Sequence, residues 1–175
     1  MWDLTSGEER LTLREHTGGV SGVAVTADGR LAVSASGDRT LKVWDLTSGA
    51  ERLTLRGHTG GVLSVAATTD GRAAISASAD GTLKVWDLTS GEERLTLPGH
   101  TGGVLSVAVT TDGRTAISAS DDHTLKVWDL ASGRCVATFY ANEALNTCSV
   151  SPDGITIVAG GASGRVHFLR LEGLG

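Results

Sequence analysis

The chain contains few residues of several types, and each shortage excludes a class of protein. Of its 175 residues, 4% are aromatic, two are proline and two are cysteine. Two cysteines (Cys135 and Cys148) do not make a disulfide framework in a chain of this length, so we expect small, buried, reduced thiols and a cytoplasmic protein. An apolar run of about 18 residues is also lacking, as is a leader with basic and apolar regions. We therefore expect no membrane span and no signal peptide.

Clusters of basic residues are missing as well. The net charge is −5, and no run of lysine and arginine is present, which argues against nucleic acid as a partner. No P-loop motif occurs, and the glycine-rich stretch 160–164 indicates a hairpin turn rather than a phosphate cradle. His123 and His167 are too far apart to suggest a metal site. The sequence thus predicts no cofactor and no metal.

What the sequence does contain is an internal repeat. Tryptophan occurs at positions 2, 44, 86 and 128, each 42 residues after the one before. The heptapeptide Thr-Leu-Lys-Val-Trp-Asp-Leu surrounds the last three of them. Many of the 24 glycines recur at fixed places in the period, which indicates turns rather than a flexible linker. A period of about 20–50 residues indicates stacked, similar units.

The repeat at residues 51–92 shows the predicted secondary structure of one unit. Four short segments, at 52–55, 62–68, 73–78 and 82–87, end in turns that contain Gly or Asp. They predict four antiparallel strands, and no stretch has a helical period. Because such a unit is apolar on both faces, we expect an all-β protein whose units stack radially as the blades of a β-propeller. A β-solenoid fits less well, since its coils are shorter than this repeat.

The repeat resembles that of the WD40 family. Gly57-His58, Asp80 and the pair Trp86-Asp87 stand in the order typical of that family. The resemblance covers nearly all of the chain and implies one repeat domain with four blade-equivalents, each of four antiparallel strands. Within residues 1–175, its predicted divisions are an orphan strand that closes the ring (1–14), three repeats (15–56, 57–98 and 99–140) and a divergent terminal repeat (141–175).

The resemblance also implies a buried hydrogen-bond tetrad in each complete repeat. An indole N–H, a hydroxyl, an imidazole and a carboxylate can satisfy one another and fix the register of the strands that carry them. Trp2 has no such partners upstream. The predicted tetrads are His16, Ser34, Asp38 and Trp44; His58, Ser76, Asp80 and Trp86; and His100, Ser118, Asp122 and Trp128.

Ser, His and Asp are also the residues of a hydrolase triad. Three copies at identical spacing indicate architecture rather than three active sites, and no G-x-S-x-G motif is present. We therefore predict that the chain is not an enzyme. The alternative is a propeller hydrolase with a site at the channel mouth, although the channel-lining strands offer Val, Ala, Ser and Leu rather than paired carboxylates.

The terminal repeat departs from the pattern. Asn142, Ala159, Ser163 and Leu169 stand at its tetrad positions. Residues 151–171 nevertheless resemble the last repeat of large bacterial WD40 proteins, many of which carry a signalling module.

Four blades are few for this family. Propellers have about 4 to 8 blades, and small residues such as Ala24, Ala66 and Ala108 at the blade contacts suit narrow wedges. Three alternatives stay open. Two chains could close an eight-bladed ring, each N-terminal strand completing the last blade of the other; the chain could be part of a longer array; or it could close as a strained four-bladed monomer.

The resemblance implies a scaffold or sensor that binds a protein or peptide. Lys42, Lys84 and Lys126 are expected at a solvated edge of the blades. The Thr-Gly-Gly loops lack the side chains typical of interface hot spots, so the variable turn residues and the divergent loop before the last repeat are the better candidates. The candidate partner-binding residues are Arg39, Asp121, His123, Tyr140, Asn142 and Glu143.

Overall fold

Fifteen strands make up the described part of the chain, which is residues 3–9 and 11–172 of a computed structural model. They form three four-stranded sheets and one three-stranded sheet, each with strands in sequence order. The described residues contain no helix, and so none that could cross a membrane. The strands are β1 (Val20–Val25), β2 (Leu31–Ser36), β3 (Thr40–Asp45) and β4 (Glu51–Arg56); β5 (Val62–Ala67), β6 (Ala73–Ser78), β7 (Leu83–Asp87) and β8 (Glu93–Leu97); β9 (Val104–Val109), β10 (Thr115–Ser120), β11 (Thr124–Asp129) and β12 (Arg134–Tyr140); and β13 (Leu145–Val150), β14 (Thr156–Gly161) and β15 (Val166–Arg170).

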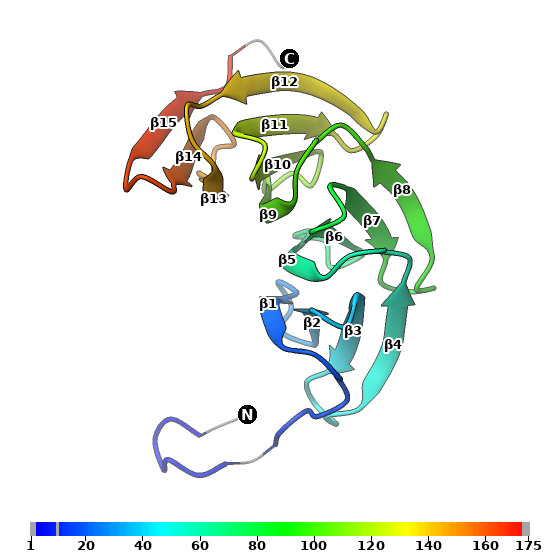
Figure 1. The fold of residues 1–175 in the computed structure, drawn as a ribbon. Coiled ribbons are helices and arrows are strands. Elements are labelled where there is room, and N and C mark those ends of the chain that lie inside the picture. The colour runs from blue at the N-terminus through cyan, green and yellow to red at the C-terminus, as the bar shows by residue number, and fades with distance from the viewer. Residues whose placement is uncertain (1–2, 10, 173–175) are drawn as a thin grey trace.

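The four sheets are arranged as consecutive blades of an open arc (Figure 1). The first strand of each sheet lies along the inner edge of the arc, and β4, β8 and β12 lie along its outer edge. The predicted all-β architecture of four blade-equivalents is confirmed. The strained four-bladed ring is not the arrangement observed, because the first and last sheets stand at opposite ends of the arc.

The start of the chain differs from its counterparts in the other repeats. Residues 11–16, which include the last four residues of the predicted orphan strand (1–14), precede β1 without forming a strand. Trp2, predicted to lack tetrad partners, lies outside the described residues.

Hydrogen bonds within the turn and a glycine with a positive φ stabilise each hairpin between the first and second strands of a sheet. In the second sheet, the Thr68 hydroxyl donates to the Asp70 carboxylate at 2.6 Å, and the backbone N–H of Arg72 donates to the same carboxylate oxygen at 3.0 Å. Gly71 then adopts a φ of 68°, which glycine accepts without steric cost. The same Thr-x-Asp-Gly-Arg turn recurs in the first and third sheets, so the turn is specified by five adjacent residues.

The core lies between sheets rather than within any one of them. Val62 and Val65 of β5 pack against Val33, Leu41 and Val43 of the preceding sheet, and all five are buried. Equivalent clusters fill the next two junctions. Burial of this apolar area is the main term that joins the sheets, at about 25 cal/mol per Å². Each junction involves only two neighbouring sheets.

Candidate functional site

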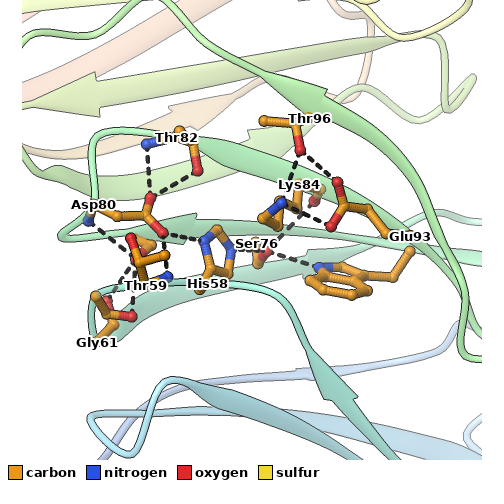
Figure 2. A network of polar contacts seen from close by, with 12 residues as sticks. His58, Thr59, Gly61, Ser76, Asp80, Thr82, Lys84, Glu93 and Thr96 are labelled. Atoms are coloured by element: carbon orange, nitrogen blue, oxygen red, sulfur yellow. Dashed lines mark hydrogen bonds and ion pairs between the residues drawn. The ribbon is translucent and has the colours of Figure 1, made fainter.

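The His58 network illustrates how a repeat is tied together (Figure 2). His58 comes from the loop before β5, Ser76 from β6, Asp80 from the turn after β6, and Trp86 from β7. His58 Nδ1 lies 2.8 Å from Asp80 Oδ2, and His58 Nε2 lies 2.7 Å from Ser76 Oγ. The indole Nε1 of Trp86 donates to the same Ser76 Oγ at 2.8 Å.

These distances fit one arrangement of protons. Because the Trp86 N–H can only donate, Ser76 Oγ accepts it and directs its own proton to His58 Nε2. His58 Nδ1 then carries a hydrogen and donates to the Asp80 carboxylate. The imidazole is neutral and the carboxylate is ionised, so every polar atom in the relay is satisfied.

The structure brings together all twelve predicted tetrad residues in the same way. In the first and third sheets, each His–Asp distance is 2.8 Å and each His–Ser distance is 2.7 Å. The Trp–Ser distance is 2.8 Å in both. Three copies of one geometry indicate a structural element repeated with the sheet.

The environment of the second and third tetrads favours the charge states that the relay requires. Burial would by itself raise the pKa of Asp80, but hydrogen bonds from Thr82, His58 and the Thr59 backbone outweigh it and hold the pKa far below its usual value. The same balance lowers the pKa of Asp122 to about 2. Burial lowers the pKa of His58, against the opposing effect of the Asp80 carboxylate. The folded state therefore favours a neutral imidazole beside an ionised carboxylate.

A hydrolytic role does not follow from this geometry. Ser76 and Ser118 are 0% exposed, so their hydroxyls cannot reach a substrate without opening of the sheet. Each hydroxyl also accepts the indole N–H of its tryptophan. The Ser, His and Asp side chains therefore belong to an internal hydrogen-bond relay that also includes the tryptophan.

Sequence reasoning missed a second polar cluster beside the tetrad. Lys84 was predicted at a solvated edge but is buried, because the outer strand β8 covers it; its Nζ donates to Glu93 at 2.7 Å and to Thr96 at 2.8 Å. Lys42 is buried likewise, with Glu51 and Thr54 as its acceptors, and Lys126 is half-buried. The recurrence of Glu nine residues after Lys was the signal available in the sequence.

The third sheet lacks the carboxylate of this cluster. Cys135 pairs with Trp128 at the position that Glu93 occupies opposite Trp86. Lys126 Nζ retains Thr138 as an acceptor at 3.2 Å. Cys135 is exposed, contrary to the prediction, because this end of the outer strand faces solvent. Cys148 is buried as predicted, and burial raises the pKa of its thiol to about 11.

The last sheet replaces the lost tetrad with one carboxylate. Glu143 accepts a hydrogen bond from the backbone N–H of Ser163, and its Oε1 lies 3.5 Å from His167 Nε2. A Cβ added at Gly161 would overlap the Glu143 carboxylate and displace it from this position. Glu143, a candidate for partner binding, therefore ties its loop to the β14–β15 hairpin instead of facing solvent.

The other candidates lie on one face, which we call the turn face. Its turns and loops are joined by backbone hydrogen bonds, such as Ala79 N–H to Gly61 O and Asp121 N–H to Gly103 O at 2.9 and 3.0 Å. Neighbouring sheets meet there, since a Cβ on Gly61 would lie 3.4 Å from Gly37 Cα. The turn face comprises the turns 37–39, 79–81 and 121–123 and the loops 17–19, 59–61, 101–103 and 140–144.

The middle position of each Thr-Gly-Gly loop is restricted to glycine by close backbone contacts. A Cβ on Gly60 would lie 2.7 Å from the backbone nitrogen of Asp80, and one on Gly102 would lie 3.0 Å from that of Asp122. Side chains cannot vary at these places without moving the tetrad carboxylate. Variation is therefore confined to the tips of the turns and to the divergent loop.

Two turn tips hold non-glycine residues in a left-handed conformation. Arg39 and His123 have φ values of 70° and 67°, where the equivalent Gly81 has 82°. This conformation costs an L-residue about 1–2 kcal/mol. Both side chains are exposed. Such backbone strain is typical of functional positions.

Three further candidates are also open to solvent. Tyr140 is 76% exposed, and Asp121 and Asn142 are exposed beside it on the turn face. Arg39 comes from the first sheet and the others from the third sheet and its following loop. The candidates thus lie along the arc on one face rather than in a single cavity.

A groove that the sequence did not reveal lies at the opposite ends of the strands. Its volume is 680 Å³, and it runs between the second and third sheets. Arg72, Arg94 and Arg114 line it together with Asp70 and Asp112. The recurring Asp-Gly-Arg tripeptide was the signal in the sequence, but the space between the sheets is visible only in three dimensions.

Comparison with known families matches most of the chain. The family described as WD domain, G-beta repeat matches four segments. Each of the three later segments begins ahead of an outer strand and ends in or near the third strand of the next sheet. A search of curated proteins finds no match. The matched segments are 7–45, 49–87, 91–129 and 133–168.

Replacing the central hydroxyl should destabilise a repeat. Ser76→Ala leaves the Trp86 N–H and the His58 Nε2 buried and unpaired, which costs about 1–3 kcal/mol for each group. Chemical denaturation measures the loss. Ser149→Ala, at an exposed serine of β13, should change the unfolding free energy by less than about 0.5 kcal/mol. Equal effects of the two variants would contradict a stabilising relay.

Acidification should lower the unfolding free energy in two stages. Because the pKa values of His58 and His100 are lowered on folding, their contribution is present above about pH 6.5 and is lost as the pH falls through the folded values. The contribution of Asp80 and Asp122, also lowered, is present above about pH 4 and is lost on further acidification.

A pH series of denaturation curves separates these two stages. His100→Gln should make the first stage shallower, while His123→Gln, at the exposed turn tip, should leave it unchanged. Constant stability of the unaltered chain between about pH 7 and pH 5 is incompatible with buried neutral histidines.

Restoring the missing carboxylate should stabilise the third sheet. Cys135→Glu places an acceptor near Lys126, as in the two preceding sheets, and should raise the unfolding free energy by about 0.5–1 kcal/mol. Cys135→Ala is the control and should show no such gain. In a double-mutant cycle, Lys126→Met should abolish the gain, and a gain that persists would show that the ion pair is not its source.

Proposed function

Because the chain belongs to the WD40-repeat family, we propose that it is a non-catalytic interaction scaffold whose turn face binds a protein or peptide. The observation that carries the proposal is the contrast between invariant and variable parts of the repeats. Loops 59–61 and 101–103 are identical in sequence, while the turn tips differ. The tip is the exposed Arg39 in the first sheet, the buried Gly81 in the second and the exposed His123 in the third.

The side chains at these positions suit the capture of an extended peptide. Arg39 offers five donors in a rigid fork, which favours a carboxylate or a carbonyl. Tyr140 offers a large, exposed amphipathic ring, a residue type enriched at interface hot spots. Asp121 and His123, adjacent at the third turn, add an acceptor and a second donor. A mixed, partly acidic peptide lying along the arc matches this distribution of charge.

A scaffold role also agrees with how the polar groups of the repeats are used. The tetrad hydroxyls are buried and occupied by their own tryptophans. Glu143 is engaged within the last sheet. The groups that remain exposed on the turn face are suited to recognition, and we do not assign catalysis to them.

We further propose a cytoplasmic, signalling setting in a bacterial type of WD40 protein. The support is indirect. The ending of the chain resembles the last repeat of large bacterial WD40 proteins, and Cys148, buried as a thiol, is suited to a reducing compartment. Expression of the tagged chain and cell fractionation would test the compartment.

Replacement of Arg39 by glycine should relieve backbone strain and also weaken peptide binding. Arg39→Gly removes about 1–2 kcal/mol of left-handed strain and restores unfolded-state entropy worth about 0.4–1 kcal/mol, so stability should rise by about 0.5–1 kcal/mol. Binding to peptides selected on an array should weaken about tenfold, as should binding by Tyr140→Ala. Calorimetry and fluorescence anisotropy measure the two effects.

Variants at the groove provide the matched control. Arg72→Ala and Arg114→Ala should retain peptide binding, because the groove is at the other end of the strands. If the groove variants weaken peptide binding while the Arg39 and Tyr140 variants do not, the binding site is the groove. That result would overturn the turn face as the binding site.

A further inference from the structure

The first sheet exposes apolar residues at positions that are buried in every later sheet. Val20 and Val23 of β1 are 53% and 69% exposed. Their counterparts in β5, Val62 and Val65, are 0% and 7% exposed because they pack against the preceding sheet. The counterparts in β9 and β13 are buried in the same way: Val104, Val107, Leu145 and Cys148.

The last sheet exposes the other half of the same junction. Val166 and Phe168 of β15 are 58% and 75% exposed. Their counterparts in β11, Leu125 and Val127, are 1% and 3% exposed because the following sheet covers them. The two ends of the arc therefore carry the two complementary faces of an interface that the chain forms three times internally.

We propose that a second copy of this chain covers both faces and closes a two-fold ring of eight sheets. The β1 face of each copy packs on the β14–β15 face of the other, with the geometry of the internal junctions. The contact is between different faces, so it is repeated until the ring closes. The open arc of four sheets in Figure 1 leaves space for a second arc of the same kind, and eight blades lie within the range of known propellers.

The segment before β1 supplies the missing outer strand of this ring. Residues 11–14 stand where β4 and β8 stand in the repeats, since the matched family segments begin ahead of each. Leu11 packs against Gly49 so closely that an added Cβ would overlap its side chain. Leu53 approaches Gly91 in the same way. The segment is therefore already held beside the first sheet, at the place that an outer strand of a preceding blade would take.

Backbone pairing explains what residues 11–14 would gain there. β15 pairs with β14, whereas its counterparts β3, β7 and β11 each pair with a strand on both sides. An open edge strand is a template for pairing with another chain. In the proposed dimer, residues 11–14 of each copy add to the outer edge of β15 of the other and complete its last sheet.

Light scattering on the full chain tests the proposal. The expected mass is twice 17.9 kDa. Val23→Asp and Phe168→Asp should each reduce the mass to that of one chain without unfolding it, because both side chains are solvent-exposed in the single chain. Val136→Asp, at an exposed valine of β12 outside both faces, should leave the dimer intact. Far-ultraviolet circular dichroism checks that each variant is folded.

Mixing the two charged variants distinguishes a head-to-tail ring from other dimers. One of the two contacts in the mixed pair joins two unaltered faces, so the mixture should recover dimer that neither variant forms alone. A monomeric native chain at about 100 μM overturns the proposal, and so does an assembly larger than two chains. A dimer that resists Phe168→Asp would pair β1 faces with each other and overturn it too. Peptide binding at the turn face is measured separately, so its failure would leave this result unaffected.

Discussion

The hydrogen-bond relay from indole to carboxylate is the constraint on which the repeat depends. It links the loop before the first strand, the second strand, the following turn and the third strand through side chains that are at most 10% exposed. Because the relay begins with an obligatory donor and ends with an ionised acceptor, its direction is fixed. A one-residue slip of a strand would turn its side chains to the other face and leave these groups unpaired. Apolar packing holds the sheets together, whereas the relay selects their register.

The lysine clusters extend the same principle to the outer strand. Lys84 lies next to the relay but points to Glu93 and Thr96, so the outermost strand is also joined to the interior by a polar contact (Figure 2). The first two sheets have this link, and the third has exchanged its carboxylate for Cys135. The last sheet has lost both links and relies on Glu143. Stabilising polar contacts thus diminish along the chain, while the backbone topology is retained.

Much of this structure could be predicted from the sequence because its information is local and repeated. Segments of alternating residues between Asp-Gly turns gave the strands, and the 42-residue spacing gave the equivalence of the tetrad positions. Burial of Lys84 could not be predicted, since it depends on how closely β8 covers β7. The role of Glu143 depends on space left by Gly161, and the strain at Arg39 depends on a backbone angle. Each of these features arises from contacts between elements, which residue types alone do not specify.

The restriction of each junction to two neighbouring sheets has a consequence for how such chains diverge. A duplication or deletion of one 42-residue unit leaves the remaining junctions chemically unchanged, because each core cluster of the described residues joins only two neighbouring sheets. The number of repeats can therefore change without disrupting the folding of the remaining units. Each added or lost unit changes the total angle of the arc by the contribution of one sheet. Selection on the number of repeats would act through closure of the assembly. The number of repeats, rather than any single residue, would decide whether an array forms a ring or an open filament.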